Sequence, residues 1–515
     1  MLIPTASEFP NDDAVIILDK TEWEMKISDN FDLITSKERH IVKKIFKNYN
    51  KHSFIKIPIF KGDEIVYISA RTIKPDGTII PVEKSEIYTI EGVEDGSQFY
   101  SDMKYKKFTF PGLEEGSIIE YYYKKYVSLP FLRDVWLLQR DIPIIYSEYS
   151  LIIPELLMTK GKFTWYYKAY NDKTLDKVTR SEVIQTTSTD WDKQVMFNWI
   201  KRDVKAFEHE PMMPEGLSEI PHMRFRPGFW KNWDDLSNWY YTELFQPKLI
   251  ISEEIKKKSK DLTKNCNDRT SKIRACYDYV KDIRYISINL NNEGIIPNEP
   301  VVVLKNQYGD CKDKSILLLS LLKSLDIEAE PVLLLTNNEG SFDKDFPTWN
   351  FNHMIITVKD EEDKYLWLDP TAEYTEFGNL PAMDQNIDVL VLHANGTSSI
   401  AKTQSPSFQN NKKIVNINIK ILENLKSNIE FDIKYFGEDR SNIKHFIENS
   451  SEKEINEYCK SMITDEFLNS TINSVIYSDF VSQGFFSLNF NVSNVDMIQK
   501  QGDLFFVLYD FLPFI

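Results

Sequence analysis

Short runs in which apolar and polar residues alternate fill the first two-fifths of the chain. Clear examples are Phe54–Ile59, Glu64–Ile68 and Ile118–Tyr123, and turn-forming residues such as Pro75 and Gly77 lie between such runs. A period of two is typical of half-buried strands, and many short strands separated by turns are typical of a sandwich. The pattern therefore predicts a β-sandwich over residues 1–212.

Helical patterns take over in the middle of the chain. The segments Asp234–Thr263 and Ser271–Ile283 predict helices, and so does Ser36–Tyr49 within the strand-rich region. Residues 212–228 are rich in proline and glycine and predict a linker. We therefore place a central domain at residues 213–400.

Strand patterns return after about residue 400. Val415–Ile419, Asn428–Tyr435 and Phe485–Val492 predict strands, and Glu452–Asn469 predicts a helix among them. This predicts a β-rich domain over residues 401–515. Taken together, the patterns predict an α+β protein of several domains, as 515 residues would suggest.

Cys311 stands at the predicted start of a helix. Asp310 is a good N-cap, Asp313 completes a capping-box spacing, and the Leu-rich run to Leu325 reads as a buried helix. The free N–H groups and positive dipole end at a helix start favour a thiolate, and the N–H of Cys311 is a candidate oxyanion donor. The flanking charges predict a polar, partly exposed helix start, which argues against the alternative of a buried structural cysteine.

A predicted hairpin carries a histidine and an aspartate. His353–Val358 and Tyr365–Asp369 read as strands joined by a short charged loop. If Val358 pairs with Lys364, His353 lies directly across from Asp369, where Cβ atoms are about 4.5–5.5 Å apart. The carboxylate could then accept a hydrogen bond from one ring nitrogen and leave the other for a thiol. A zinc site at these three residues is an alternative, but the pairing fits orientation better than coordination.

These residues resemble the transglutaminase-like superfamily, whose core has a papain-like Cys-His-Asp arrangement. The resemblance extends to one bacterial subgroup and covers nearly the whole chain. It is carried by Ile283–Tyr285, Gly294, Pro297, Tyr308–Lys314, Phe351–His353 and Leu368–Thr371, and in the N-terminal third by Ala70–Thr72, Pro75–Thr78 and Pro111–Ser117. It implies a papain-like α+β core preceded by a β-rich domain of unknown function, and often followed by a smaller β-rich domain.

The resemblance also implies roles for single residues. Cys311 would be the nucleophile, His353 the base and Asp369 the orienting carboxylate. Gln307 stands where the subgroup often has a basic residue, so it is a weak oxyanion candidate for which a surface role is the alternative. Tyr285 is a second weak candidate. No metal or cofactor is implied.

The leading functional interpretation is an enzyme that transfers acyl groups from protein or peptide amides through a cysteine. Hydrolysis is favoured, which would make the chain a peptidase or amidase, because cross-linking also requires an amine site and a shielded thioester. The alternatives are a protein-crosslinking transglutaminase and a non-catalytic binding module of the cell envelope with a dormant triad. Peptides of the cell wall or envelope are among the expected substrates.

The net charge of −16 argues against nucleic acid as a partner. The four cysteines, at positions 266, 276, 311 and 459, form no Cys-x-x-Cys pair, so neither a zinc ribbon nor a disulfide framework is predicted. The composition does not indicate an oligomeric state.

The sequence predicts no membrane-spanning segment and no signal peptide, because it has no apolar run of 18 residues and residues 1–8 lack a basic segment. The apolar, strand-like residues 504–515 suggest truncation at the C-terminus. The resemblance implies a periplasmic or cell-envelope location, and without it a cytoplasmic location would be expected.

Overall fold

The chain forms two compact units. Unit 1 comprises residues 1–371 and 387–402, and unit 2 comprises residues 372–386 and 403–515. The three-part division at residues 212 and 400 stays a prediction. The computed structural model describes residues 3–28, 33–59, 62–91, 100–101, 104–127, 135–159, 165–172, 179–184, 193–211, 213, 216–228, 230–286, 288–289, 294–340, 343–360, 362–405, 407–462, 471–496 and 498–507.

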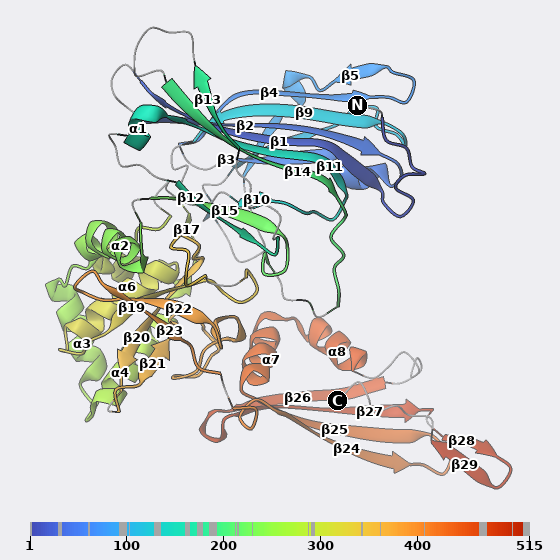
Figure 1. Cartoon of the computed structure of the whole chain (residues 1–515). Coiled ribbons are helices and arrows are strands. Elements are labelled where there is room, and N and C mark those ends of the chain that lie inside the picture. Colours follow the sequence, from blue (N-terminus) through green and yellow to red (C-terminus); the bar gives the residue numbers. More distant parts are fainter. Residues whose placement is uncertain are drawn as a thin grey trace. The chain divides into compact units, whose positions relative to one another are not determined.

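The N-terminal part of unit 1 is built almost entirely from strands (Figure 1, blue to green). Its strands are β1 (Ala14–Ile27), β2 (Leu33–Ile45), β3 (Phe54–Ile59), β4 (Glu64–Ile73), β5 (Ile79–Pro81), β6 (Tyr88–Glu91), β7 (Tyr100–Ser101), β8 (Lys104–Thr109), β9 (Ile118–Tyr126), β10 (Val135–Leu137), β11 (Ile144–Pro154), β12 (Trp165–Tyr170), β13 (Thr179–Ile184), β14 (Lys193–Val204) and β15 (His222–Pro227). The short helices are η1 (Tyr49–His52), η2 (Lys84–Glu86) and α1 (Glu155–Thr159).

One large sheet organises this region. Its eight strands run in the order β13-β14-β11-β1-β2-β9-β4-β5, and two three-stranded sheets, β3-β8-β6 and β10-β15-β12, pack against it. Ile57 and Phe108 of the first small sheet lie in one core cluster with Ile41, while Phe225 of the second lies in another with Trp199. The region is strand-rich as expected, and the finer expectation of a β-sandwich stays a prediction.

Two predictions in this region are wrong. The helix expected at Ser36–Tyr49 is instead mostly β2, a central strand paired with β1 and β9. The linker expected at residues 212–228 contains β15, which pairs with both β10 and β12. The strand tolerates the nearby prolines, because Pro221 precedes it and Pro227 is its last residue, so neither interrupts the hydrogen bonds in its middle.

The second part of unit 1 combines helices with a five-stranded antiparallel sheet in the order β21-β20-β19-β22-β23. The helices are α2 (Trp233–Asn238), η4 (Trp239–Phe245), η5 (Gln246–Lys248), α3 (Glu253–Thr263), α4 (Arg269–Lys281), α5 (Pro300–Asn306) and α6 (Cys311–Lys323). The strands are β16 (Arg284–Tyr285), β17 (Ile288–Asn289), β18 (Tyr308–Gly309), β19 (Glu330–Leu334), β20 (His353–Lys359), β21 (Tyr365–Leu368), β22 (Asp388–Leu392) and β23 (Ser398–Lys402).

Helix α6 lies at the centre of this part. It packs against β19 and β20 and is contacted by α3, α4 and α5. Leu317, Leu318, Leu321 and Leu322 are fully buried, as the sequence predicted. Burial of this kind fixes the helix firmly, so its first residue occupies a well-defined position beside the sheet.

Among the described residues, unit 2 holds a four-stranded sheet in the order β24-β25-β27-β26, a short hairpin, two α-helices and two short 3-10 helices. Its elements are η6 (Ala382–Asp384), β24 (Lys413–Ile421), β25 (Ser427–Phe436), α7 (Glu438–Asn449), α8 (Glu452–Ser461), β26 (Thr471–Phe480), η8 (Val481–Gln483), β27 (Phe485–Val495), β28 (Ile498–Gln501) and β29 (Leu504–Val507). The predicted helix Glu452–Asn469 corresponds to α8, although residues 463–470 lie outside the described residues, and α7 was not predicted. Residues 508–515 of the apolar C-terminal segment lie outside them too.

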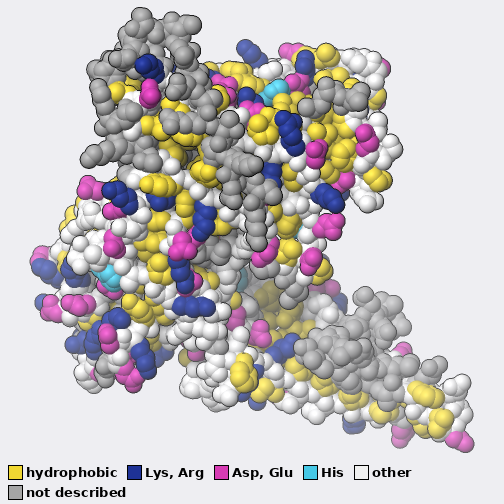
Figure 2. Space-filling view, in the orientation of Figure 1, with side chains coloured by type: hydrophobic (Ala, Val, Ile, Leu, Met, Phe, Trp, Pro, Cys, Tyr) yellow, Lys and Arg dark blue, Asp and Glu magenta, His cyan; other side chains and the backbone are white. Residues whose placement is uncertain are grey.

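Basic and acidic side chains are interspersed over the described surface on the face drawn in Figure 2. No helix among the described residues combines the length and the apolar character that a membrane crossing needs.

Candidate active site

Cys311 is the first residue of α6, as predicted from the sequence. The Asp310 side chain accepts a hydrogen bond from the N–H of Asp313 at 3.1 Å, and the Asp313 carboxylate accepts one from the N–H of Asp310 at 3.4 Å. This reciprocal capping box fixes the helix start. Cys311 itself is half-buried and free.

A close approach just before Cys311 requires glycine. A Cβ atom built on Gly309 would lie 2.7 Å from Cβ of Asp313, well inside van der Waals contact. Asp313 cannot move away, because its carboxylate also accepts hydrogen bonds from the N–H and the side-chain amide of Asn298 at 2.7 and 3.2 Å. The glycine thus lets the capping box and the loop at Asn298 close on each other.

The charged residues around Cys311 are buried, which corrects the expectation that they form a polar, partly exposed helix start, although Cys311 itself is half-buried. Lys312 pairs with Asp310, and Lys314, only 1% exposed, donates to the carbonyls of Lys281 and Ile283 at 3.0 and 2.6 Å. The charges are therefore satisfied internally instead of by water. Burial by itself would lower the pKa of Lys312, but the negative charges of Asp310 and of a Cys311 thiolate raise it above its usual value.

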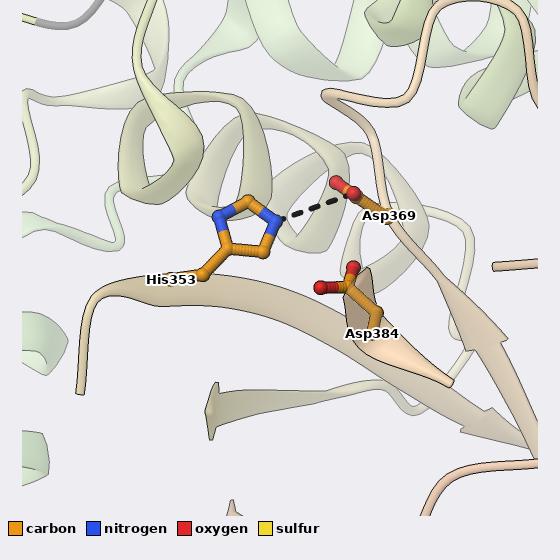
Figure 3. A group of neighbouring side chains, drawn as sticks. All are labelled: His353, Asp369 and Asp384. Carbon is orange, nitrogen blue, oxygen red and sulfur yellow. Dashed lines mark hydrogen bonds and ion pairs between the residues drawn. The ribbon is translucent and has the colours of Figure 1, made fainter. Parts of the chain in front are cut away.

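His353 and Asp369 form the hydrogen bond that the sequence predicted. His353 opens β20, Asp369 directly follows β21, and Nε2 of His353 lies 3.2 Å from Oδ2 of Asp369 (Figure 3). The expected register is wrong by two residues, because Val358 pairs with Leu366 and not with Lys364. A shift of two keeps both side chains on the same face of the sheet, so they still meet, diagonally.

Thr371 holds the other oxygen of the carboxylate. Its N–H and its Oγ1 both donate to Oδ1 of Asp369, at 2.8 and 2.7 Å, which leaves Oδ2 for His353. Burial by itself would raise the pKa of Asp369, but His353 and Thr371 stabilise the charged form more strongly, so this pKa lies below its usual value. Asp369 is therefore a fixed anion beside the imidazole.

Two further contacts position His353 relative to Cys311. Asn352 and Thr336 exchange two hydrogen bonds, of 3.0 and 2.7 Å, which anchor the beginning of β20 to the end of β19. Ser315 Oγ on α6 donates to the carbonyl of Met354 on β20 at 3.1 Å. Sequence reasoning singled out neither Ser315 nor Thr336, because such contacts require the fold.

Cys311 and His353 line one cavity of about 740 Å³. Its walls come from the helix start at residues 310–312, the segment 348–354, the loop at Gly294 and Ile295, and residues of β10 and β15. Tyr240 also lines the cavity and donates from its buried hydroxyl to the carbonyl of Ile295 at 2.7 Å. A cavity of this size suits part of a peptide or a small molecule.

The two weak oxyanion candidates, Tyr285 and Gln307, lie in different places relative to the cavity. Tyr285 lines the cavity and is 37% exposed. Gln307 is an exposed residue at the end of α5, and its amide donates to the Tyr279 hydroxyl at 2.8 Å and to the Leu304 carbonyl at 2.6 Å. Gln307 is not among the residues that line the cavity, so its placement corresponds to the surface alternative.

The zinc alternative would require Cys311 to share a metal ion with His353 and Asp369. Among the described residues, no group of ligand side chains close enough to share an ion includes Cys311. Nε2 of His353 is instead taken by Asp369.

Two family models match the chain. Residues 35–207 match a domain of unknown function, DUF3857, and residues 256–370 match the transglutaminase-like superfamily. The second match begins in α3 and ends just after Asp369, so it contains Cys311 and His353 as well. No curated protein is significantly similar to the chain in sequence.

A solved structure has a similar fold over nearly the whole chain. A candidate protease from Parabacteroides distasonis superposes with a TM-score of 0.58 at 14% identity, and the match covers 94% of this chain and 93% of that one. A candidate cysteine protease from Cytophaga hutchinsonii matches at 10% identity over 72% of this chain and 87% of its own, with a TM-score of 0.21 that is too low to support a comparison. The first likeness concerns the fold alone. The chain therefore carries a transglutaminase-like domain at residues 256–370, preceded by a DUF3857 domain at residues 35–207.

Proposed function

We propose that the chain is a cysteine-dependent enzyme that hydrolyses amide bonds of peptides or proteins. The observation that carries this proposal is the His353–Asp369 hydrogen bond at the edge of a cavity that Cys311 also lines. A base oriented by a carboxylate next to a thiol at a helix start is the arrangement that activates a nucleophile.

The hydrogen bond between His353 and Asp369 supports a proton path through the other ring nitrogen of His353. Because Nε2 of His353 is bound to Asp369, Nδ1 takes the proton from the Cys311 thiol. The thiolate attacks the amide carbonyl carbon, the C–N bond breaks, and the imidazolium returns the proton to the leaving amine. A thioester on Cys311 remains. His353 then removes a proton from water, the hydroxide attacks the thioester, and the thiol and a carboxylic acid are released.

The start of α6 offers stabilisation for the tetrahedral intermediates. The N–H of Cys311 is the first of the helix and has no acceptor within it. An oxyanion formed at the attacked carbonyl would lie next to this N–H and to the positive end of the helix dipole.

Hydrolysis and cross-linking share this chemistry up to the thioester and differ in what attacks it. We favour hydrolysis because a cross-linking enzyme must also bind an amine and keep water from the thioester. The name of the Parabacteroides distasonis protein, a candidate protease, fits this preference.

Activity measurements with matched variants would test the proposal. Wild type, Cys311→Ala and Cys311→Ser would be incubated with casein, with a library of N-acetylated peptides, with glutaminyl peptides with and without an added amine, and with cell-wall peptides. We expect cleavage by the wild type alone. Cleavage retained by Cys311→Ala would refute the nucleophile, Cys311-dependent amine incorporation would identify a transglutaminase, and binding without turnover in all three proteins would identify a binding module.

A further inference from the structure

Arg224 brings a positive charge to the cavity from outside the transglutaminase-like domain. It lies on β15, between residues 207 and 256, where neither family model matches. It lines the cavity that Cys311 and His353 line, and it also borders a smaller neighbouring cavity of about 30 Å³.

A neutral histidine holds this arginine. Nδ1 of His222 donates to the carbonyl of Ile220 at 2.8 Å, so Nε2 carries no proton and accepts a hydrogen bond from Nε of Arg224 at 3.2 Å. Burial lowers the pKa of His222 to about 4, which keeps the ring neutral. The ring also stacks on Tyr170, with centroids 4.7 Å apart and planes 7° from parallel.

The charge of Arg224 is not balanced by a carboxylate. Among the described residues, its guanidinium forms no ion pair within 4.0 Å. The acid that acts on it at longer range is Asp343, and that carboxylate is already bound by Lys168 at 2.8 Å and by the Tyr170 hydroxyl. Burial lowers the pKa of Arg224 from its usual value, as expected for a desolvated cation.

Three other shielded arginines among the described residues are paired with carboxylates, whereas Arg226, which does not line the cavity, donates to the carbonyl of Trp230. Arg39 and Arg140 both bind Asp19, and Arg440 binds Asp479. The second basic residue that lines the cavity, Lys312, is paired with Asp310. Of the two described lysine and arginine side chains that line the cavity, Arg224 is therefore the one whose charge has no described carboxylate partner, and because it is half-buried, that charge is costly until a counter-charge arrives.

We propose that Arg224 is a specificity residue that binds a carboxylate of the peptide substrate, which rests on the proposed function of the cavity. Its Nε is fixed by His222, and its two terminal nitrogens remain to form the forked hydrogen bonds that a carboxylate accepts. The carboxylate is either the C-terminal group of a short peptide or an Asp or Glu side chain near the scissile bond. Glu339, an exposed residue of the same cavity, would disfavour a second acidic group nearby.

Matched peptides would test this proposal. N-acetylated pentapeptides of randomised sequence would first be compared with a free and with an amidated C-terminus. Amidated peptides with Asp or Glu at each position would then be compared with the same peptides that carry Asn or Gln there. We expect the wild type to favour one acidic form over its neutral counterpart by roughly 10- to 100-fold in kcat/KM, the range of a charge-assisted contact. A preference for the free over the amidated C-terminus would identify the C-terminal carboxylate, and a preference for Asp or Glu over Asn or Gln would identify a side-chain carboxylate.

Variants would assign the preference to Arg224. Arg224→Gln should bring the ratio of kcat/KM for the acidic and the neutral peptide close to one. Arg224→Lys keeps the charge but not the forked geometry, so it should retain part of the preference for the acidic peptide. Arg202→Gln is the matched control, because Arg202 stacks on Tyr146 in β11 and does not line the cavity. Its ratio should equal that of the wild type. An equal ratio in wild type and Arg224→Gln would overturn the proposal.

A binding measurement separates this proposal from the proposed function. In Cys311→Ala, which cannot turn over, calorimetry with the same peptides should show tighter binding of the acidic form, lost when Arg224→Gln is added. If binding depends on Arg224 but the wild type shows no turnover, the proposed enzymatic function is refuted and the carboxylate site is supported. If the wild type turns the peptides over but Arg224→Gln changes neither measurement, the carboxylate site is refuted and the enzymatic function is supported.

Discussion

Nε2 of His353 lies 3.2 Å from Oδ2 of Asp369 although the two residues do not pair in the sheet. β20 and β21 pair so that Ile356 faces Leu368, which places Asp369 one step beyond the last paired residue of β21. The chain turns there, and Thr371 fixes Oδ1 through two hydrogen bonds. The contact therefore depends on the turn at Thr371 as much as on the strands.

Replacing Asp369 by asparagine should leave a folded protein with little activity. The carbonyl oxygen of the introduced amide can still accept from Thr371, but the side chain no longer carries the charge that stabilises the imidazolium. We expect kcat to fall on the order of 10³-fold with a small change in thermal stability. Cys311→Ala should remove turnover entirely. Activity of Asp369→Asn equal to the wild type would contradict the role of this carboxylate.

Thr371→Val should show that the turn positions Asp369. The substitution removes the 2.7 Å bond from Oγ1 and keeps the one from the backbone, so we expect kcat to fall about 10-fold and stability to fall by about 1 kcal/mol. Thr397 offers a matched control, because its N–H and Oγ1 bind Oδ1 of Asn395 in the same way, at 3.0 and 2.7 Å, on the surface. Kinetics of Thr397→Val should match the wild type. Equal losses in both variants would mean that the motif only stabilises the fold.

Sequence reasoning could predict the hairpin, the helix start and the face that His353 and Asp369 share, because these depend on local pattern. It could not predict the helix–strand choice at Ser36–Tyr49. The buried residues Ile41 and Ile45 are four apart, which suits a helix and a strand equally. The strand is favoured by the fold, because β1 and β9 pair with it on both sides and supply hydrogen-bond partners along its length, and Glu38 and His40 also find partners in Lys124 and Glu120.

The local sequence pattern also could not identify residues whose contacts form only in the folded chain. The charges flanking Cys311 resemble a solvated helix start in the sequence, and only the structure pairs Lys312 with Asp310 and Asp313 with Asn298. Arg224 lies far from Cys311 along the chain, in a stretch that reads as a linker, so nothing local connects it with the cavity.

The buried Lys312–Asp310 pair should matter more for stability than an exposed pair. Lys312→Met leaves the Asp310 carboxylate buried without its counter-ion, and we expect the free energy of unfolding to fall by about 3 kcal/mol. Lys364→Met removes a pair with Glu362 whose side chains are 72% and 71% exposed, and should cost less than about 0.5 kcal/mol. Urea unfolding of both variants measures the difference. Similar values would show that Lys312 is not a structural counter-ion.

The four cysteines should differ in reactivity. Burial raises the pKa of Cys276 to about 12 and that of Cys459 to about 11, whereas Cys311 is half-buried beside Lys312 at a helix start. Iodoacetamide at about pH 7 should therefore label Cys311 first, and His353→Ala should slow that labelling. Peptide mapping gives the rates, and Cys266, also half-buried, is the internal control. Labelling of all four at one rate in the folded protein would exclude an activated thiol.

His222 should make the protein less stable in weak acid. Its pKa is about 4 in the folded protein, because of burial, against about 6.5 in an unfolded chain. As pH falls from 6.5 towards 4, the unfolded chain binds a proton that the folded one does not, so stability decreases over this range. We expect this group to lower the free energy of unfolding by about 1–2 kcal/mol between about pH 7 and pH 5.

Urea unfolding at these two pH values tests the role of His222. The variant His222→Gln should lose less stability on acidification than the wild type. The exposed His209 gives the control His209→Gln, which should lose as much as the wild type. An unchanged pH dependence in His222→Gln would mean that the ring is protonated in the fold and does not accept from Arg224.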